Sequence, residues 1–542
     1  MRRAKKTAPA PQRAGLASFA GTKVRTSRKT PNNSCNFFTK IIQKITAHLI
    51  IYRRTRGTQT TFSTSPLHKN KKLTNFAMNK NNTSSMKRRD FIKSSAILAV
   101  GTSVSQYANA ENPSARPSLQ SEESTGPLID SAPMLQNYAA NSMGIAFSVT
   151  DMANGFVSFS ENPDMNNAET VKCGGYRVTD MNDKVMLVRL TGLKPATTYY
   201  YKIGADRISY KGGYNMKVLD TEIDSRIYHF TTAGENAKPH FCVINDTHVN
   251  WNSFTKIVDK LVELNPSCVI WNGDASNVEE TIEAQKRIFL KPEISHTDYA
   301  AEIPYLFCCG NHDSRGLANR HMEKVWMFRQ PEERLSRDWD LGRNFAIRMG
   351  DIALIGLDTA EDKLDTNPLF AGLFNSKAYR EAQTPWLRDA LRQPEIASAP
   401  YLVAFCHIPL FDPDPKANPG DLYPADKDPN YSPDFASWQR TCAQLWTPLL
   451  EEAGCQVVIV AHQHVYRYDA PTENRKWAQI VGGGPNMQKE GRSYPTVIEG
   501  TIEGNQLKIT VHNIRDQKVQ EVLTFAPRKV KKSKKNSKNK QH

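Results

Sequence analysis

The feature that most limits the possible folds of this chain is a series of continuous apolar runs, each ending in polar residues. "PHFCVIND" (239–246), "SCVIWNGD" (267–274) and "IPYLFCCGNHD" (303–313) lack the alternation that marks a strand with one wet face. Strands of this kind are buried on both faces, and the helical pattern "FTKIVDKLVEL" (254–264) lies between the first two. The pattern predicts an α/β layered domain, with central β-sheets flanked by helices, over residues 238–515.

Later runs extend the same domain. "FAIRMGDIALIGLDT" (345–359) predicts an antiparallel strand pair, and "YLVAFCHIP" (401–409) and "CQVVIVAHQHVYRY" (455–468) predict further central strands. "PTVIEGTIEGNQLKITVHN" (495–513) predicts a hairpin. Residues 134–234 instead show short alternating strands separated by turn signals, which predicts a small all-β sandwich before the α/β domain.

Charge is unevenly distributed along the chain. The formal net charge is +16, but residues 1–85 carry 18 Lys and Arg with no acid, and residues 528–542 carry 8 more. Residues 111–527 contain 41 basic and 54 acidic residues, so the body of the protein is acidic. This distribution argues against a nucleic-acid-binding core.

The stretch from Met86 to Ala110 reads "MKRRDFIKSSAILAVGTSVSQYANA". Paired arginines, a short apolar run and a terminal Ala-x-Ala predict a twin-arginine-type signal peptide over 86–110, and hence an exported protein, periplasmic or secreted. We expect residues 1–85 to be an over-extended N-terminus, 111–133 a linker and 528–542 a basic disordered tail. We expect no transmembrane segment in the mature chain, because the apolar stretch 41–52 is short and interrupted by Lys and His.

Eight cysteines follow the predicted signal, and none forms a CxxC pair. Cys242, Cys268, Cys308 and Cys406 lie inside apolar runs, where a free cysteine packs as a small core residue. The sequence predicts that most of the eight are buried thiols, and it assigns no disulfide.

Carboxylate, amide and imidazole side chains occur at the ends of five predicted strands. In open α/β sheets, ligands bind beyond the carboxyl ends of the strands, so these side chains are expected to converge. Such oxygen and nitrogen donors suit Mn, Fe or Zn, and one carboxylate is able to bridge two ions. In chain order the segments are Asp246-Thr247-His248, Gly273-Asp274, Asn311-His312-Asp313, His407 and His462-Gln463-His464.

This ordered set resembles the motif series of the calcineurin-like metallophosphoesterases over about residues 238–500. The resemblance implies two divalent or trivalent metal ions per chain, a metal-bridging hydroxide as nucleophile and a small phosphorylated substrate. It implies that the first ion is held by Asp246, His248 and His464, the second by Asn311, His407 and His462, and that Asp274 bridges them. It further implies that His312 acts at the leaving oxygen without binding metal, and that Asp313 orients His312 and raises its basicity.

The predicted sandwich carries a second resemblance. "LKPATTY" (193–199), followed by Tyr201, is similar to a fibronectin type III signature, as in the N-terminal domain of purple acid phosphatases. Two motif positions depart from that family, because His248 replaces its glycine and Asn277 replaces its iron-binding tyrosine. The resemblance therefore implies a non-purple site without a charge-transfer band.

Several interpretations stay open at this point. The accessory domain favours an acid phosphatase-like phosphomonoesterase, with a phosphodiesterase or nucleotidase of the same superfamily as the alternative. An alternative from another class is an exported binding or adhesion protein that acts through the sandwich. A metal site that lacked some of its expected ligands would favour this alternative, and none of the expected ligands is missing from the sequence. Three local features have two interpretations each: Gly482–Gly484 as close approach or turn, 411–435 as active-site wall or surface excursion, and Arg315 and Arg320 as phosphate ligands or surface ion pairs.

Overall fold

The computed structural model describes residues 126–173, 181–328, 339–363, 365–413, 433–488 and 490–530. The predicted signal peptide, the residues before it, most of the linker and tail, and residues 414–432 of the predicted insertion lie outside these ranges. Within the described ranges, no helix has both the length and the apolar character needed to cross a bilayer.

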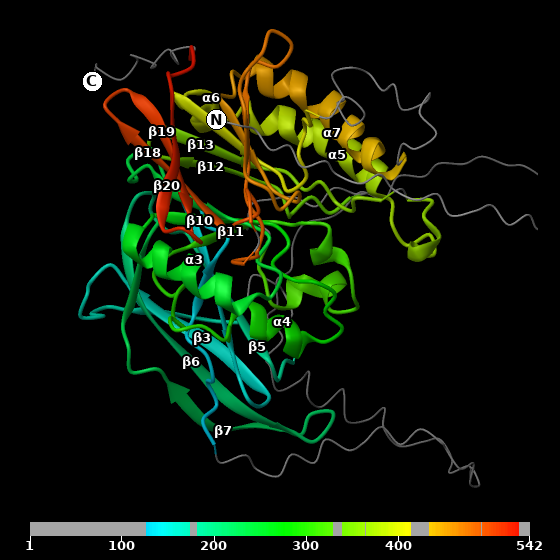
Figure 1. Ribbon diagram of the computed structural model, residues 1–542. Coiled ribbons are helices and arrows are strands. Elements are labelled where there is room, and N and C mark those ends of the chain that lie inside the picture. The colour runs from blue at the N-terminus through cyan, green and yellow to red at the C-terminus, as the bar shows by residue number, and fades with distance from the viewer. Residues whose placement is uncertain are drawn as a thin grey trace, which may run out of the picture. The chain divides into compact units, whose positions relative to one another are not determined.

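The strands form three sheets (Figure 1). The largest has nine strands in the order β20-β19-β18-β9-β10-β11-β1-β2-β5, and β9, β10 and β11 are parallel. Its strands are β1 (Met134–Gln136), β2 (Ser142–Ser148), β5 (Val185–Thr191), β9 (His240–Ile244), β10 (Cys268–Asn272), β11 (Tyr305–Cys308), β18 (Thr496–Glu503), β19 (Gln506–Asn513) and β20 (Lys518–Phe525).

The other two sheets have six and five strands. The six-stranded sheet has the order β12-β13-β14-β15-β17-β16, from β12 (Phe345–Met349), β13 (Ile352–Gly356), β14 (Tyr401–Phe405), β15 (Val457–Val460), β16 (Arg467–Asp469) and β17 (Ala478–Val481). The five-stranded sheet consists of β3 (Ala153–Ser160), β4 (Glu169–Lys172), β6 (Thr198–Tyr210), β7 (Met216–Ile223) and β8 (Tyr228–Thr231). The predicted antiparallel pair and C-terminal hairpin are both present, as β12–β13 and β18–β19.

Helices cover the outer faces of the two larger sheets. α3 (Trp251–Leu264) is capped by Asn250, whose side chain accepts a hydrogen bond from the Ser253 amide at 3.2 Å. α3 buries Phe254 and Ile257 against the nine-stranded sheet, and α4 (Ile282–Phe289) packs in the same hydrophobic cluster. α5 (Ser376–Ala390) and α7 (Pro433–Glu452) lie side by side on the six-stranded sheet (Figure 1), and the short α6 (Pro394–Ala397) follows α5. The inner faces of both sheets share one core, in which the Phe241 and Phe405 rings are 5.8 Å apart. The result is the mixed α/β architecture that the apolar runs predict.

The β-rich region of residues 134–231 joins the α/β domain through a continuous sheet. β1 pairs in parallel with β11 at Gln136 and Tyr305, so β1, β2 and β5 extend the nine-stranded sheet. The Gln136 side chain donates to the Val325 carbonyl at 3.0 Å, and Tyr201 donates to the Ala301 carbonyl at 2.6 Å. The change of strand pattern near residue 238 therefore separates two sequence patterns but does not separate two sheets.

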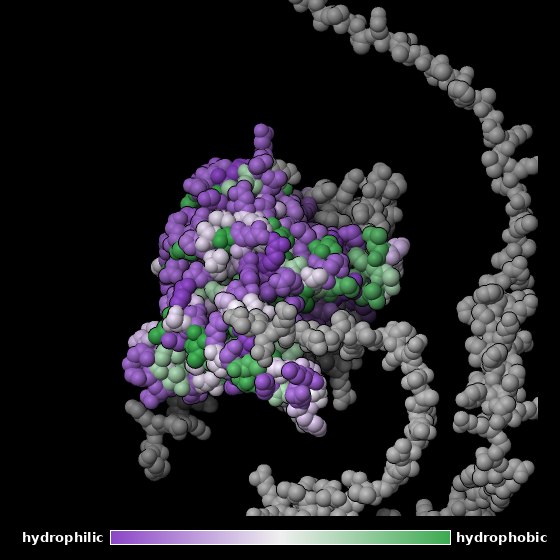
Figure 2. All heavy atoms as spheres, turned by 90° about the horizontal axis from the view of Figure 1, so that it is seen from below, coloured by the Kyte–Doolittle hydropathy of each residue, from purple (hydrophilic) through white to green (hydrophobic). Residues whose placement is uncertain are grey.

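None of the eight described cysteines forms a disulfide, and all except Cys173 are buried, as predicted. The face shown in Figure 2 is mainly hydrophilic, with separate hydrophobic patches. Exposed apolar side chains also occur on the edge strand β7, where Met216, Val218 and Ile223 each have more than half of their surface accessible.

A partly buried ion-pair cluster links β9, β18 and β19. Glu499 on β18 contacts His240 Nε2 at 2.9 Å and His512 Nε2 at 3.0 Å. Hydrogen bonds from His240 and then His512 lower the pKa of Glu499 to about 2. Because the folded pKa lies below the usual glutamate value, the ionised carboxylate stabilises the fold above about pH 4.5 and loses this effect as the pH falls toward 2.

We predict that Glu499→Gln lowers the free energy of unfolding by about 1–2 kcal/mol at pH 7, and by less at pH 3. Urea denaturation at both pH values measures this difference. Glu503→Gln, on the same strand but 63% exposed, is the control and should change stability by less than about 0.5 kcal/mol. An equal cost of Glu499→Gln at both pH values would contradict the assignment.

Candidate metal centre

Five strand ends from two different sheets meet at one point. β9, β10 and β11 contribute Asp246, His248, Asp274 and Asn311, and the ends of β14 and β15 contribute His407, His462 and His464. His407 Nε2 lies 3.2 Å from Asp274 Oδ2, and His464 Nε2 lies 3.2 Å from Asp246 Oδ1. His462 Nδ1 is 2.9 Å from the side-chain oxygen of Asn311. The structure thus brings together all seven residues in which the sequence predicts metal ligands.

These side chains fall into two groups that share one carboxylate. Asp246, His248, Asp274 and His464 offer ligand atoms within 4.8 Å of one another, and Asp274, His407 and His462 do the same. Asp274 is the shared member and is nearly inaccessible to solvent. Asn311 lies beside the second group through His462. Two cation sites that share Asp274 match this arrangement.

The donor set fits bound cations. Asp246 Oδ1 and His407 Nε2 are both buried and make no hydrogen bond, although each lies 3.2 Å from a group of opposite charge and they are 3.8 Å apart. A buried polar atom without a hydrogen bond costs about 1–3 kcal/mol, so two such atoms aimed at one point fit a bound cation. Carboxylate oxygen and imidazole nitrogen suit Mn, Fe or Zn.

The electrostatics of the cluster favour ionised carboxylates. Burial acts to raise the pKa of Asp274 and Asp246, but the facing histidines outweigh it and hold both values below that of an ordinary aspartate. Burial likewise acts to lower the pKa of His407, but Asp274 raises it to about 10. The pocket therefore stabilises positive charge beside its carboxylates, as a cation site does.

The backbone is strained at most of the ligand positions. Asp246, His248, Asp274, His462 and His464 have φ values of 46°, 45°, 50°, 69° and 56°, in the left-handed region that non-glycine residues rarely adopt. Each such residue costs about 1–3 kcal/mol and persists only where the surrounding structure fixes it. Strain of this kind concentrates at functional sites, and here it turns five side chains toward one point.

Asp313 is placed differently from its predicted role. Its Oδ2 accepts from the amides of Asp274 and Gly310, each at 2.8 Å, and its Oδ1 accepts from the amide and hydroxyl of Ser276 at 3.2 and 2.8 Å. Both oxygens are therefore occupied by the turn around Asp274, and neither contacts the His312 ring. The His312 ring contacts the Asn277 carbonyl at 3.2 Å through Nδ1 instead. Through these hydrogen bonds Asp313 holds the turns after β10 and β11 in place.

Three asparagines near the centre were not identified as site residues from the sequence. Asn277 contacts His248 Nδ1 at 3.0 Å through its side-chain oxygen. Asn272 donates to the carbonyls of Cys406 and Ile459, both at 3.1 Å, and so ties the two sheets together beside His407. Asn245 donates to Asp246 Oδ2 at 2.7 Å. Asn245 and Asn272 directly precede motif residues, and Asn277 stands at the motif position that differs from the purple acid phosphatase pattern; these positions were the only signal in the sequence.

Gly482–Gly484 serve close approach, which decides between the two interpretations left open. A Cβ at Gly482 would lie 2.0 Å from Asn245 Oδ1, and one at Gly484 would lie 2.5 Å from the Cβ of His464. None of the three has a positive φ. The glycines let this segment pass directly behind the ligands.

A sixth strand end also reaches the centre. The segment after β13 places Asp362 Oδ2 3.9 Å from His462 Nε2 and fully buries the Glu361 side chain. Arg315 forms ion pairs with both acids, whereas the Arg320 guanidinium stacks on the Phe374 ring at 4.8 Å. Asp362 and Glu361 follow an apolar strand like the predicted ligands do, so the same pattern could have revealed them.

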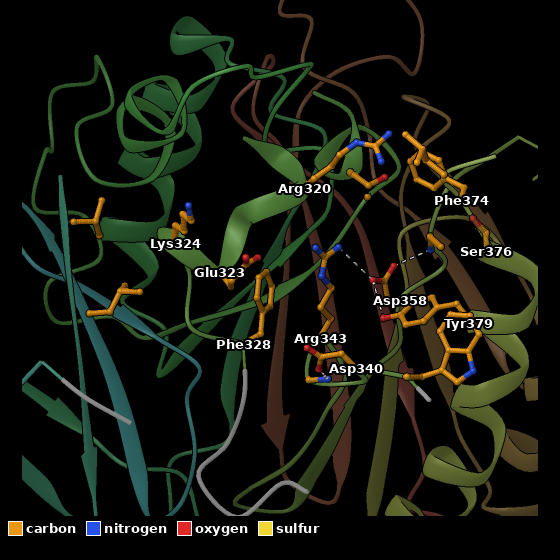
Figure 3. A pocket seen from close by; sticks show the side chains of 18 of the residues that line it. Arg320, Glu323, Lys324, Phe328, Asp340, Arg343, Asp358, Phe374, Ser376 and Tyr379 are labelled. Atoms are coloured by element: carbon orange, nitrogen blue, oxygen red, sulfur yellow. Dashed lines mark hydrogen bonds and ion pairs between the residues drawn. The ribbon is translucent and has the colours of Figure 1, made fainter. Parts of the chain in front are cut away.

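A cavity of about 750 Å³ lies beside the turn that carries Asn311 and His312 (Figure 3). Gly310 and Ser314 line it on one side, and α5 lines it through Ser376 and Tyr379. Arg343 faces Asp358 across its floor at 3.8 Å. The seven predicted metal ligands are not among its described lining residues, so the cavity borders the metal centre without containing it.

Comparison with known proteins agrees with this geometry. Residues 239–466 match the family model of the calcineurin-like phosphoesterases. The solved purple acid phosphatase PPD1 from yellow lupin (Lupinus luteus) seeds is similar over 73% of this chain and 74% of its own, with a TM-score of 0.50 and 14% identity. GAP50, the anchor in the inner membrane complex of Plasmodium, is similar over 55% of this chain and 91% of its own, with a TM-score of 0.37 and 12% identity. Comparison with curated protein sequences finds no match.

The domain at residues 239–466 is therefore a calcineurin-like phosphoesterase domain, as the motif series predicts. At 14% identity, the likeness to the lupin enzyme shows a shared fold, including the β-rich region before the phosphoesterase domain. The family match supports hydrolase activity toward phosphoester bonds for this domain.

We predict that Asp313→Asn reduces both stability and metal content. An amide offers one acceptor oxygen where the turn presents four donors, so the free energy of unfolding should fall by about 2–3 kcal/mol. Thermal denaturation and metal analysis measure the two effects.

The matched control for this prediction is Asp365→Asn. Asp365 also accepts two backbone amides, from Ser376 at 2.7 Å and Lys377 at 3.1 Å, but it lies outside the metal cluster. The Asp365→Asn variant should lower the free energy of unfolding and leave the metal content unchanged. If Asp313→Asn instead kept full stability and metal and lost only turnover, Asp313 would belong to the catalytic imidazole after all.

Proposed function

We propose that this protein is an exported, dinuclear metal-dependent phosphomonoesterase. The observation that carries the proposal is the pair of ligand groups sharing Asp274, with buried atoms of Asp246 and His407 that make no hydrogen bond. Preference for monoesters is supported by the sandwich signature at 193–199, and export by the sequence of residues 86–110. Phosphodiesterase or nucleotidase activity is the alternative within the same class.

The residues have distinct proposed roles. Asp246, His248 and His464 would hold the first ion, Asn311, His407 and His462 the second, and Asp274 both. Bound ions would supply Lewis acidity toward phosphoryl oxygens and activation of water at neutral pH. Asn277 and Asn272 keep His248 and His407 in fixed orientations, because His407 Nδ1 contacts the Asn272 carbonyl at 2.9 Å.

His312 is assigned to the leaving oxygen of the ester. Its amide donates to Asp274 Oδ1 at 2.9 Å, and its ring packs edge-on against His248 with centroids 4.9 Å apart, yet it belongs to neither ligand group. An imidazole placed beside the bridging carboxylate but outside the metal groups is suited to contact the reacting ester.

A binding or adhesion role through the sandwich has less support. A degenerate centre lacking ligands would favour it, and all seven expected ligands are brought together. Exposed apolar residues on β7 identify no partner.

The decisive experiment is metal analysis of the purified protein together with hydrolysis of 4-nitrophenyl phosphate and bis(4-nitrophenyl) phosphate. We expect about two metal ions per chain, hydrolysis that chelation abolishes and faster cleavage of the monoester. Asp274→Asn should lose both ions, because it removes the shared carboxylate. No bound metal and no hydrolysis after addition of Mn, Fe or Zn would refute the proposal, and faster diester cleavage would transfer it to the alternative.

We predict that His312→Ala lowers kcat by about 10²–10⁴-fold and leaves the metal content unchanged. Steady-state kinetics and metal analysis on one preparation test this. His321→Ala, a nearby histidine that is 60% exposed, is the control and should keep full activity. Loss of metal in His312→Ala would show that His312 is a ligand.

A further inference from the structure

Arg315 follows the η1 turn (His312–Ser314), and its guanidinium is held from two sides. Nε donates to Glu361 Oε2 at 3.0 Å, and Nη2 donates to Asp362 Oδ1 at 2.8 Å. The third nitrogen, Nη1, lies 3.0 Å from His312 Nε2. Because a guanidinium is planar and permanently charged, the two carboxylates fix the direction in which Nη1 points.

The contacts of the two ring nitrogens of His312 determine which of them carries the proton. Nδ1 faces the Asn277 carbonyl oxygen at 3.2 Å, and a carbonyl only accepts, so Nδ1 is the protonated nitrogen. Nε2 then accepts from Arg315 Nη1. In this arrangement the hydrogen bond between the two side chains runs from the guanidinium to the imidazole.

The ion pair between Arg315 and Glu361 is more deeply buried than an ordinary surface ion pair. The Glu361 side chain is fully buried, and Arg315 is only 20% exposed. Lys363 Nζ lies 2.7 Å from Asp362 Oδ1, so a second cation already compensates that acid. The cluster therefore holds two cations against two carboxylates.

We propose that Arg315 contacts the substrate and donates a hydrogen bond from Nη1 to the ester oxygen that leaves. The proposal rests on the proposed phosphoesterase function. An ester bound beside Asp274 would accept the hydrogen bond from Nη1 that His312 Nε2 accepts now, so Arg315 and His312 would face the same oxygen. As hydroxide bonds to phosphorus and the P–O bond to the leaving group breaks, negative charge grows on the leaving oxygen. The fixed cation stabilises this charge, and the oxygen then takes its proton from water. The benefit is greatest for alkyl phosphates, whose alkoxide leaving groups are most basic.

The test compares Arg315→Gln with the control Lys363→Gln, which removes a cation from the same cluster at a position that contacts Asp362 but not His312. For ethyl phosphate, Arg315→Gln should lower kcat by about 10²–10³-fold, with KM nearly unchanged. For 4-nitrophenyl phosphate, whose leaving group needs little stabilisation, the loss should be below about tenfold. Lys363→Gln should change either rate by less than about threefold.

A binding measurement tests the same contact without turnover. Calorimetric titration of the metal-loaded protein with inorganic phosphate should show about tenfold weaker binding in Arg315→Gln and unchanged binding in Lys363→Gln. If the wild-type protein binds metal and phosphate but hydrolyses no ester, the proposed function fails, whereas the phosphate titration still decides the role of Arg315.

Folding effects are separated by a second variant. Arg315→Gln leaves Glu361 buried without its partner, which destabilises proteins strongly, whereas Arg315→Gln with Glu361→Gln removes both charges. The double variant should retain the kinetic and binding defects of the single one. Recovery of activity in the double variant, equal losses on both esters or unchanged phosphate affinity would overturn the proposal.

Discussion

Two buried carboxylates that offer oxygens within 4.8 Å of one another, Asp246 and Asp274, are the constraint on which the rest of this structure depends. Two ionised groups this close repel each other and have lost most of their hydration, so the fold must supply positive charge around them. His407 and His464, whose pKa values these carboxylates raise, do so in part, and Asp246 Oδ1 still makes no hydrogen bond. Bound cations would complete the compensation.

Holding this arrangement requires both sheets and several strained residues. The two core sheets meet face to face, and the Asn272 side chain spans them by binding carbonyls at the ends of β14 and β15. Asp313 organises the turns after β10 and β11 through four accepted hydrogen bonds. These contacts brace the strand ends around the ligands, and Asp313 directly holds Asp274, one of the five ligand residues with positive φ.

Much of the fold and site was predictable from local patterns. Unbroken apolar runs identified β9, β10, β11, β14 and β15, because a strand buried on both faces has no polar alternation to display. Their polar endings identified the ligand residues, because parallel strands bring their carboxyl ends to one edge. The join between β1 and β11 was not predictable, since a single bridge at Gln136 and Tyr305 leaves no periodic trace in either segment. The role expected for Asp313 also differed from its contacts, because sequence adjacency to His312 does not determine where a short side chain points.

The sequence by itself determined the kinds of groups present and the strand ends that carry them, since both follow from residue identity and hydrophobic periodicity. The tertiary structure alone decided how those groups interact. It divided the ligands into two sets around Asp274, showed that Gly482–Gly484 make room for Asn245 and His464, and placed Arg315 between His312, Glu361 and Asp362. Arg315 and Glu361 are 46 residues apart, and their contact exists only because η1 and the segment after β13 converge on one centre. Contacts between distant segments depend on how sheets pack, which no local pattern records.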